Sequence, residues 1–543
     1  MSDERDAWDE AGAIPVTGED LEQGRQPSAP SADEPHGQPD KHDQHATLHD
    51  DPEELAKLAT DTDIASDVTA TDAEAQWNAD AEARLRANPK TVALWSGRSL
   101  LGLVAIGAAV ALGVGAVWAA GSGAFAVDRE PVNEQITPMA GEQQIVCAPG
   151  QLRVQSGEGG STSIVPVSDA NPVVPELEGA ETAQLPIGNV EGAELTSVQA
   201  PVGDSVLGGM SWTSADDAEI AGLSGAACTS PAASQWLVGG ATTTGRSSII
   251  VLANPSEQPT TVRLEVFTTE GPADSAANSA ITIEPGTATA IDLASLSVDN
   301  ASPAVLVRSE GSAVAAFMQH SIIRGLEPGG IDTISGQPAA TTDQTFVGVP
   351  LSGRTSANVD GDGSDVQSTL RLVAAEDTVV RIEFSSPGTN PTTTEVPLAA
   401  GTVIDMDLSA LPEGDYTIDI QSDAPVAAGM RSLPADGSVV ADFVWLSPSR
   451  TIDGEVTVDA RPRGHDRELV VYNASDDTQV IEVDGTEHEL VAGALFSMEL
   501  GQDPVVLRGS GIRASVVMTD DGLIAGYSVQ PVPPAAAAVT VEY

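Results

Sequence analysis

The feature that most constrains the fold is a series of short strands that recurs three times after residue 233. In each copy an apolar strand precedes a strand whose residues alternate between apolar and charged. The apolar strands are expected at 249–254, 368–373 and 468–473, and the alternating ones at 261–267, 379–384 and 479–483. Strict alternation is typical of a sheet with one buried and one solvated face. Each copy continues through a glycine turn, Gly286, Gly401 or Gly493, into further strands.

The length of each copy selects the fold class. A spacing of about 100 residues suits a β-sandwich of six or seven strands. We therefore expect an all-β ectodomain of tandem β-sandwich-like repeats at 233–340, 341–450 and 451–543, preceded by a loop-rich β module at 128–232. A β-propeller is the alternative, because blades of about 45 residues would place two blades in each copy.

The two cysteines, Cys147 and Cys228, both lie in the module at 128–232. An even cysteine count outside a membrane is typical of a disulfide. We expect Cys147 and Cys228 to be bonded to each other, and two free thiols are the alternative.

An uncharged segment at 99–127 predicts a single transmembrane helix. Its central 21 residues, Leu100 to Ala120, are long enough to cross a hydrocarbon core of about 30 Å. Basic residues dominate the N-terminal flank, whereas the C-terminal flank is mixed, which places the N-terminus in the cytoplasm. The pattern indicates a signal-anchor at the cell membrane with the C-terminal ectodomain outside.

Two further patterns lie in this segment. Ala105, Ala109 and Gly113 are four residues apart, a spacing that lets two helices approach closely and is compatible with a homodimer. The small-x-small sequence at 124–126 would suit a cleaved signal. However, 98 residues precede the segment, so we favour the anchor.

The residues before the segment form two regions. Residues 1–70 are acidic, poor in apolar periodicity and rich in Pro, Gly and Ser, which predicts a disordered cytoplasmic tail. Four histidines occur here without the spacing of a defined metal site. Residues 71–98 favour a short juxtamembrane helix.

The charge of the chain excludes one class of partner. The sequence carries 80 acidic and 24 basic residues, a net charge of −56. A nucleic-acid-binding protein needs a basic surface to displace counterions from phosphates, so we expect no nucleic acid partner.

No catalytic motif stands out in the ectodomain. It has three histidines, His320, His465 and His488, and none has a nucleophile at a recognisable spacing. A surface or core position is the usual role for such residues, so we expect no Ser-His-Asp site and no cofactor. Carboxylate pairs for glycoside hydrolysis are uninformative here without geometry, since acids are so abundant. We expect Trp212, Trp236 and Trp445 to be core anchors.

One run resembles a metal loop. Asp360, Asp362 and Asp365 could supply alternating oxygen ligands to Ca²⁺. Arg371 stands at the twelfth position, where an EF-hand has a bidentate glutamate. A polar hairpin loop is therefore the favoured interpretation, and the Ca²⁺ site is a weak candidate.

A family resemblance rests on short motifs. Cys228, the segments 236–240 and 252–255, and Gly245-Arg246 together resemble an uncharacterised actinobacterial family of single-pass, membrane-anchored envelope proteins with a β-rich ectodomain. The second copy, with Ala374, lacks the Asn-Pro of the first, whereas the third keeps the asparagine, Asn473, and lacks the proline. The resemblance implies a place in cell-envelope glycan biology and carries no assigned activity.

These patterns together predict a membrane-anchored extracytoplasmic scaffold or binding protein of the bacterial cell envelope. Its partner would be an envelope protein or a glycan. The alternatives are a glycan-active enzyme with a hidden carboxylate pair, and a single-pass sensor whose tail relays extracellular binding.

Overall fold

The computed structural model describes most of the chain after residue 132. The described ranges are 133–136, 142–157, 161–201, 207–273, 280–337, 339–352, 366–434, 442–459, 466–501, 503–520, 522–532 and 539–542. They belong to one compact unit, which runs from Asp128 to Tyr543. Within these ranges the regular secondary structure is β-strand with short 3-10 segments and no α-helix, so the expectation of an all-β fold is confirmed to that extent.

The predicted membrane segment cannot be compared with the structure. None of the described residues forms a helix long and apolar enough to cross a membrane. The predicted tail at 1–70, helix at 71–98 and span at 99–127 all lie outside the described ranges.

The first repeat forms two sheets that pack face to face. Its elements are β10 (Ser234–Val238), β11 (Arg246–Asn254), β12 (Thr260–Thr268), β13 (Gly271–Pro272), β14 (Ile281–Ile283), β15 (Thr287–Asp292), the 3-10 turn η2 (Leu293–Ser295), β16 (Ala304–Glu310), β17 (Ala315–Arg324) and β18 (Glu327–Ser335). One sheet has the order β10-β16-β12-β13 with β14 beside β12, and the other has the order β15-β11-β17-β18. Leu264 and Ile250, from the two sheets, belong to one shared apolar core.

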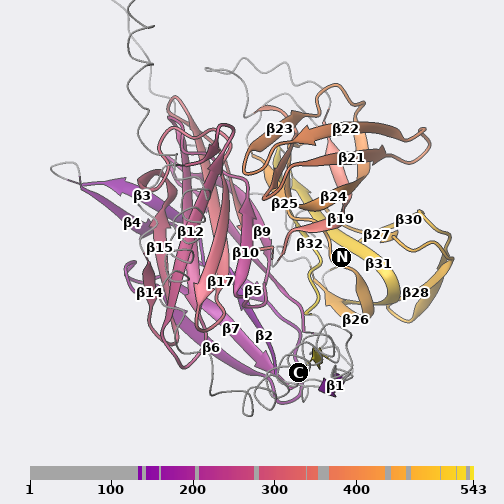
Figure 1. The fold of residues 1–543 in the computed structure, drawn as a ribbon, viewed down its shortest axis with the longest axis horizontal. Helices are drawn as coiled ribbons and strands as arrows, with labels where there is room; N and C mark the ends of the chain where they lie inside the picture. Colours follow the sequence, from indigo (N-terminus) through magenta and orange to yellow (C-terminus); the bar gives the residue numbers. More distant parts are fainter. Residues whose placement is uncertain are drawn as a thin grey trace, which may run out of the picture. The chain divides into compact units, whose positions relative to one another are not determined.

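The second and third repeats form one curled seven-stranded sheet each (Figure 1). The second contains β19 (Thr341–Leu351), β20 (Thr369–Ala374), β21 (Thr378–Ser385), β22 (Thr392–Leu398), β23 (Val403–Asp407), β24 (Gly414–Ser432) and β25 (Val444–Leu446). The third contains β26 (Ile452–Val458), β27 (Asp466–Asn473), β28 (Gln479–Val483), β29 (Thr486–Leu490), β30 (Leu495–Glu499), β31 (Val505–Asp520) and β32 (Leu523–Ser528). Each sheet curls around its own apolar core.

A long strand joins the two layers in these repeats. β24 pairs through its first half with β19 and β21, and through its second half with β20 and β25. β31 pairs in the same way with the corresponding strands of the third repeat. In the first repeat the equivalent strand is broken into β16 and β17. Strand pairing therefore repeats three times in one pattern, whereas the exact repeat boundaries drawn from the sequence stay a prediction.

An asparagine turn marks the first and third repeats. Asn254 Nδ2 donates to the carbonyls of Gln258 and Ile283, and Ser256 donates back to Asn254 Oδ1. Asn473 and Ser475 make the same bonds in the third repeat. The second repeat has Ala374 at this position and so lacks the side-chain amide that makes these bonds. This is the copy whose sequence lacks the asparagine of the motif.

The recurring turn glycines have the conformation expected of them. Gly286, Gly401 and Gly493 have φ values of 64°, 71° and 72°. A residue with a Cβ adopts this left-handed region only at a cost, so glycine is favoured at all three turns.

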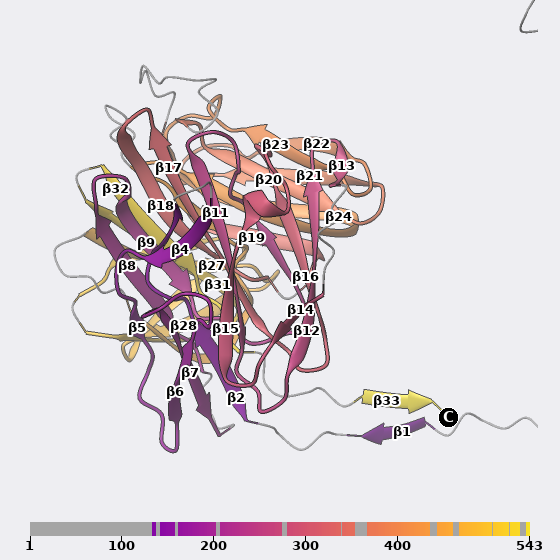
Figure 2. The ribbon, with the colours of Figure 1, turned by 90° about the vertical axis from the view of Figure 1, so that its left-hand side faces the viewer.

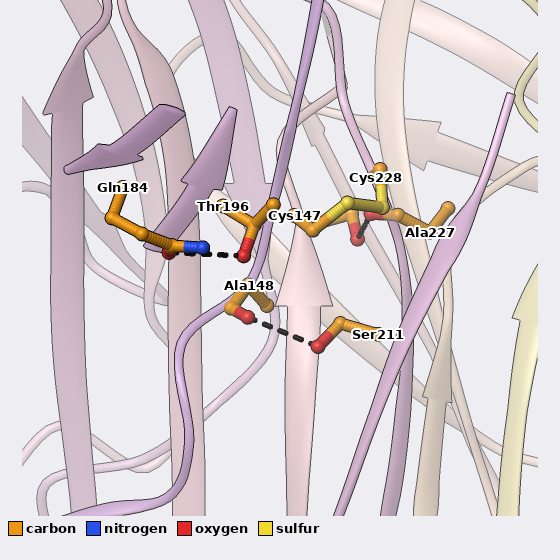
Figure 3. Close-up of a disulfide and its surroundings, with 8 residues drawn as sticks. Cys147, Ala148, Gln184, Thr196, Ser211, Ala227 and Cys228 are labelled. Carbon is orange, nitrogen blue, oxygen red and sulfur yellow. Dashed lines mark hydrogen bonds between the residues drawn. A yellow bond between two sulfur atoms is a disulfide. The ribbon is translucent and has the colours of Figure 1, made fainter. Parts of the chain in front are cut away.

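The cysteine-containing module has three small sheets. Its strands are β2 (Gln143–Cys147), β3 (Leu152–Ser156), β4 (Thr162–Pro166), β5 (Asn171–Val173), β6 (Glu181–Pro186), β7 (Glu194–Ala200), β8 (Met210–Asp216) and β9 (Ala221–Ala227), in the orders β2-β7-β6, β3-β4 and β5-β8-β9. The expected disulfide between Cys147 and Cys228 is present (Figure 3). It joins the end of β2 to the residue after β9, and nearby Ser211 Oγ donates to the carbonyl of Ala148 at 3.0 Å. β1 (Asn133–Ile136) pairs with β33 (Val539–Glu542), as Figure 2 shows.

The first and second repeats approach each other closely. Trp236, Leu306 and Ala427 share one small apolar core between them. A Cβ on Gly429 would lie 2.2 Å from the carbonyl oxygen of Val238, so only glycine fits there. The modules are therefore packed against one another rather than joined by free linkers.

Removing the disulfide should destabilise the protein. The bond closes a loop with a sequence separation of 81 residues, and the chain-entropy model gives on the order of 4 kcal/mol for a loop of that size. We expect the Cys147→Ala, Cys228→Ala double variant of the full chain to unfold at a lower urea concentration than the oxidised protein. Reduced wild type should behave like the double variant, and equal midpoints for all three would show that the bond contributes nothing.

Candidate functional site

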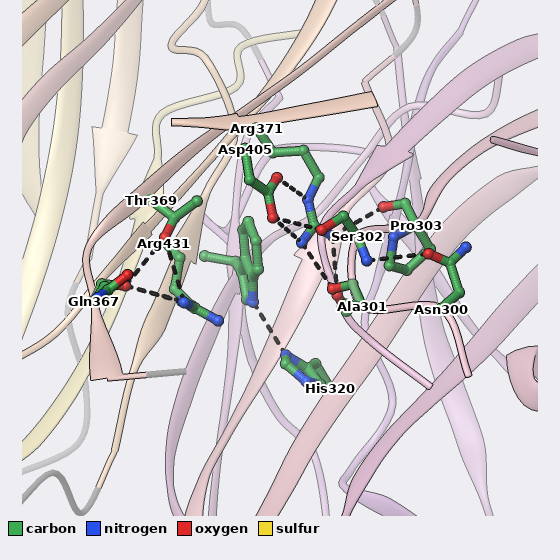
Figure 4. Close-up of polar contacts among 12 residues, drawn as sticks. Asn300, Ala301, Ser302, Pro303, His320, Gln367, Thr369, Arg371, Asp405 and Arg431 are labelled. Atoms are coloured by element: carbon green, nitrogen blue, oxygen red, sulfur yellow. Dashed lines mark hydrogen bonds and ion pairs between the residues drawn. The ribbon is translucent and has the colours of Figure 1, made fainter. Parts of the chain in front are cut away.

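Arg371 fixes the contact between the first two repeats (Figure 4). It lies on β20 with its side chain 2 % exposed, and it forms a bidentate pair with Asp405 at 2.7 and 2.9 Å. Its remaining N–H groups donate to backbone carbonyls of the first repeat, those of Gly240, Ala301 and Pro303. Every N–H group of this buried guanidinium donates a hydrogen bond in a fixed direction. The two repeats can therefore pack together in only one arrangement.

His320 occupies the core beside this contact. Its Nδ1 accepts a hydrogen bond from Trp445 Nε1 at 3.1 Å, which leaves the proton on Nε2. Burial, and then the nearby arginines, lower the pKa of His320, so the imidazole is neutral. Arg371 and Arg431 lie over the ring of Trp445, at 5.1 and 5.7 Å from its centroid. His320 is therefore a packed core residue.

Asp442 connects all four modules. Its carboxylate accepts backbone N–H bonds from Leu223 of the cysteine module (2.8 Å), Ile331 of the first repeat (3.1 Å) and Ile524 of the third repeat (3.3 Å). Asp442 itself belongs to the second repeat and is fully buried. Burial raises the pKa of this carboxyl above its ordinary value, although the N–H bonds act in the other direction. This residue holds the modules in register.

A polar cleft of about 370 Å³ opens between the second and third repeats. From the second repeat, β19, β21 and β24 contribute Asp343, Thr345, Arg381, Glu383, Asp419 and Gln421; from the third come Tyr472, Ala474 and Arg513. This cleft is the candidate functional site, because a concave surface with converging polar groups is the usual setting of a ligand site.

A hydrogen-bonded network forms the floor of the cleft. Thr345 Oγ1 donates to Asp419 Oδ1 at 2.6 Å, and the hydroxyl of Tyr472 donates to Asp419 Oδ2 at 3.2 Å. Arg513 donates to Thr345 Oγ1 and, at 2.6 Å, to Asp343. Burial raises the pKa of Asp419, while its two hydroxyl donors and Arg513 oppose the shift. Burial and the neighbouring Asp419 carboxylate also raise the pKa of Tyr472, so its hydroxyl stays a donor.

Two charged side chains in the cleft are left for a ligand. Glu383 is the direct register partner of Asp419 across β21 and β24, so both side chains project from the same face. Its contact among the described residues is a long 3.5 Å bond from Thr393. Arg381, two residues earlier on the same face, makes no ion pair within the described ranges. Together they could accept from a hydroxyl or ammonium group and donate to an oxygen.

The residues singled out by sequence lie elsewhere. Asp360, Asp362, Asp365 and His465 are outside the described ranges, and no group of metal-binding side chains forms within those ranges. His488 stacks on Phe496 in the third repeat, with ring centroids 4.4 Å apart. Trp236 and Trp445 are buried, as expected of core anchors. Trp212 is partly buried against the apolar core of the third repeat.

Sequence reasoning missed the cleft because its parts are ordinary strand residues. The alternating pattern predicts that Arg381 and Glu383 lie on the solvated face of their strand, and within their own repeat they do. Their pairing with Tyr472 and Arg513 requires the docking of two repeats.

The sequence can now be placed among known proteins. A family model described as "Family of unknown function (DUF5719)" matches residues 181–491. The chain belongs to this family. The match runs from β6 of the cysteine module to just after β29 of the third repeat, and it confirms the expectation of an uncharacterised family. DUF5719 carries no assigned activity.

Other comparisons add no functional argument to the DUF5719 assignment. No protein of curated function matches the chain. A structure of Thermotoga maritima 1070 is 18 % identical, covers 20 % of this chain and 93 % of its own, and has a TM-score of 0.17. A tetra-tandem repeat from the extending region of a large adhesion protein is 9 % identical, covers 74 % and 94 %, and has a TM-score of 0.10. Scores this low support no shared fold.

Replacing Asp442 should loosen the whole unit. The Asp442→Ala variant leaves three buried backbone donors without their acceptor, and each such donor costs about 1–3 kcal/mol. We expect the free energy of unfolding, from urea titration, to fall by about 3 kcal/mol or more. The exposed Asp476→Ala variant is the control and should behave as wild type. Equal effects of the two substitutions would contradict the role given to Asp442.

The pair of Arg371 and Asp405 predicts a pH dependence. Burial raises the pKa of Asp405, but the charge and hydrogen bonds of Arg371 outweigh it and hold the pKa below its ordinary value. A carboxyl with a lowered folded pKa contributes stability above its unfolded pKa of about 3.9, and that contribution disappears as pH falls through the folded pKa. The stability difference between wild type and Asp405→Asn should therefore shrink when urea titrations are repeated below about pH 4. A difference that stays constant between pH 7 and pH 3 would argue against this linkage.

Proposed function

We propose that this chain is a membrane-anchored, extracytoplasmic binding protein of the bacterial cell envelope, whose ligand site is the cleft between the second and third repeats. The repeats would act as sandwich-like modules that hold this site rigidly above the membrane. The cleft is the observation that carries the proposal. Its floor is pre-organised by the Arg513, Thr345, Asp419 and Tyr472 network, and Arg381 and Glu383 face it with unused hydrogen-bonding capacity.

The chemistry of the cleft favours a polyhydroxylated ligand. Carboxylates accept hydrogen bonds from sugar hydroxyls, a guanidinium donates to ring or carbonyl oxygens, and a tyrosine offers both a ring and a hydroxyl. A cell-envelope glycan supplies such a ligand and agrees with the resemblance noted from the sequence. An envelope protein remains the other partner class, and a sensor role would add a signal through the tail.

One observation favours a second candidate function, glycoside hydrolysis. Glu383 and Asp419 are direct cross-strand partners, and the Cβ atoms of such a pair lie about 4.5–5.5 Å apart. Burial raises the pKa of Asp419, as in a general acid beside an ionised carboxylate. Against this, both oxygens of Asp419 already accept a bond, from Thr345 and from Tyr472. We therefore favour binding without turnover.

Binding and turnover can be separated in one experiment. The full-length protein in detergent is titrated calorimetrically with a soluble digest of bacterial cell-wall glycan, and the digest is analysed afterwards for new reducing ends. Saturable binding without new ends supports the proposal. New reducing ends that disappear in Asp419→Asn would establish the hydrolase instead. Absence of both binding and turnover would overturn both candidates.

The Glu383→Gln variant should weaken glycan binding about tenfold or more, because a hydrogen bond to a charged group contributes about 1.5–3 kcal/mol. Glu383 is partly exposed, so the variant should keep the wild-type unfolding midpoint. Glu487→Gln, an exposed substitution on β29, is the matched control and should bind as wild type. Equal affinity in all three proteins would remove the cleft from the proposal.

A further inference from the structure

A second, smaller cavity of about 230 Å³ lies beside the polar cleft. The two cavities share Asp343 and Arg513, so the ion pair of these residues divides them. The smaller cavity is lined on its other sides by Gln344, Arg450 and Gln530, among others. Its wall includes residues 448–451 of the segment 447–451, which links the second repeat to the third.

This linker is held in place by all three repeats. The amide of Ser449 donates to the carbonyl of Thr345 at 2.8 Å, and Gln530 Nε2 donates to the carbonyl of Pro448 at 2.8 Å. Ser447 donates to the carbonyl of Ser335 at 3.2 Å. A linker clamped at successive residues presents its side chains in a fixed position, which is the condition for a pre-organised site.

Arg450 has no counter-ion among the described residues. The residue is half-buried, yet it forms no ion pair and no side-chain hydrogen bond within the described ranges. Burial alone lowers its pKa, with no carboxylate acting in the other direction. This is unexpected in a chain with 80 acidic and 24 basic residues, because carboxylates that could pair with a buried cation are abundant. Arg371, by comparison, is matched on every side.

Two further donors around the cavity are unsatisfied. Ser449 Oγ and Arg513 Nε are both buried and have no hydrogen-bond partner in the part of the chain that the structure describes. Buried polar atoms without partners are uncommon, and each one calls for an explanation. Arg513 is paired with Asp343 at 2.6 Å, and both residues line this cavity, so the cation there without a counter-ion among the described residues is Arg450.

We propose that this cavity is an anion site, in which Arg450 binds an oxyanion of the carboxylate or phosphate class with Ser449 and Arg513 as additional donors. A guanidinium presents two parallel N–H groups that match two oxygens of such an anion. The volume suits a small ion or the charged end of a larger ligand that enters from the adjoining cleft. The site goes beyond the proposed glycan cleft and does not depend on it.

The test uses the full-length protein and compares inorganic phosphate, acetate and sodium chloride at matched ionic strength. We expect phosphate or acetate to raise the midpoint of thermal unfolding in a saturable manner, and chloride to have no saturable effect, because a ligand that binds only the folded state stabilises it. Stabilisation by phosphate and by acetate alike would indicate a general oxyanion site, and stabilisation by one of them identifies the class. The same midpoint in all three salts would overturn the proposal.

Variants assign the effect to the cavity. Arg450→Gln should lose the phosphate or acetate shift, with affinity reduced roughly tenfold or more. Without anion it should be as stable as wild type or more stable, because it removes a half-buried unpaired charge, whereas a structural arginine would destabilise the fold on removal. Ser449→Ala should keep the fold and weaken the shift. Arg263→Gln, at an exposed arginine paired with Glu310, is the control. A shift that persists in Arg450→Gln would contradict the assignment.

The two proposals fail separately. Glu383→Gln should weaken glycan binding and leave the anion shift unchanged, and Arg450→Gln should abolish the shift even if no glycan binds. A stronger anion shift in Glu383→Gln, where a repelling carboxylate is removed, would show that the anion occupies the larger cleft instead.

Discussion

The carboxylate of Asp442 accepts backbone N–H groups from the cysteine module, the first repeat and the third repeat while belonging to the second. These donors come from β9, β18 and β32, strands that are far apart in the sequence. In a buried site each bond is strengthened by the low dielectric, and each missing partner is costly for the same reason. Asp442 therefore fixes the relative position of four modules that apolar packing alone would hold less specifically. The shape of the cleft between the second and third repeats depends on the relative position in which this junction holds them.

Arg371 shows the same principle at the contact of the first two repeats. Apolar residues such as Trp236 and Ala427 pack there, but hydrophobic contact is non-directional. The guanidinium needs Asp405 and carbonyls of the first repeat at defined angles, and the bare backbone of Gly429 lets the strands approach closely enough. Buried ionic groups add little net stability, so the main consequence here is a single arrangement of the modules.

Because the modules are held rigidly, charged residues that take no part in holding them together are candidates for ligand binding. A chain so acidic has many carboxylates in solvent, and most of them carry no functional information. Glu383 and Arg381 differ because they face a cleft whose floor is already hydrogen-bonded. Arg450 differs because it is a half-buried cation without a counter-ion in the described ranges. Both cavities meet at the ion pair of Arg513 and Asp343, so a ligand with hydroxyl groups and one charged end could span the two.

The sequence by itself determined the all-β fold, the strands of the three repeats, the turn glycines such as Gly286 and the pairing of Cys147 with Cys228. These follow from local patterns: alternation of apolar and charged residues, backbone conformations that glycine favours, and an even cysteine count. Only the tertiary structure decided that β24 and β31 are continuous strands linking two layers, that Asp442 joins four modules, and that Arg381, Glu383 and Arg450 face cavities. The physical reason is that a charged residue on a strand has the same local signal whether its outer face meets water or a neighbouring repeat.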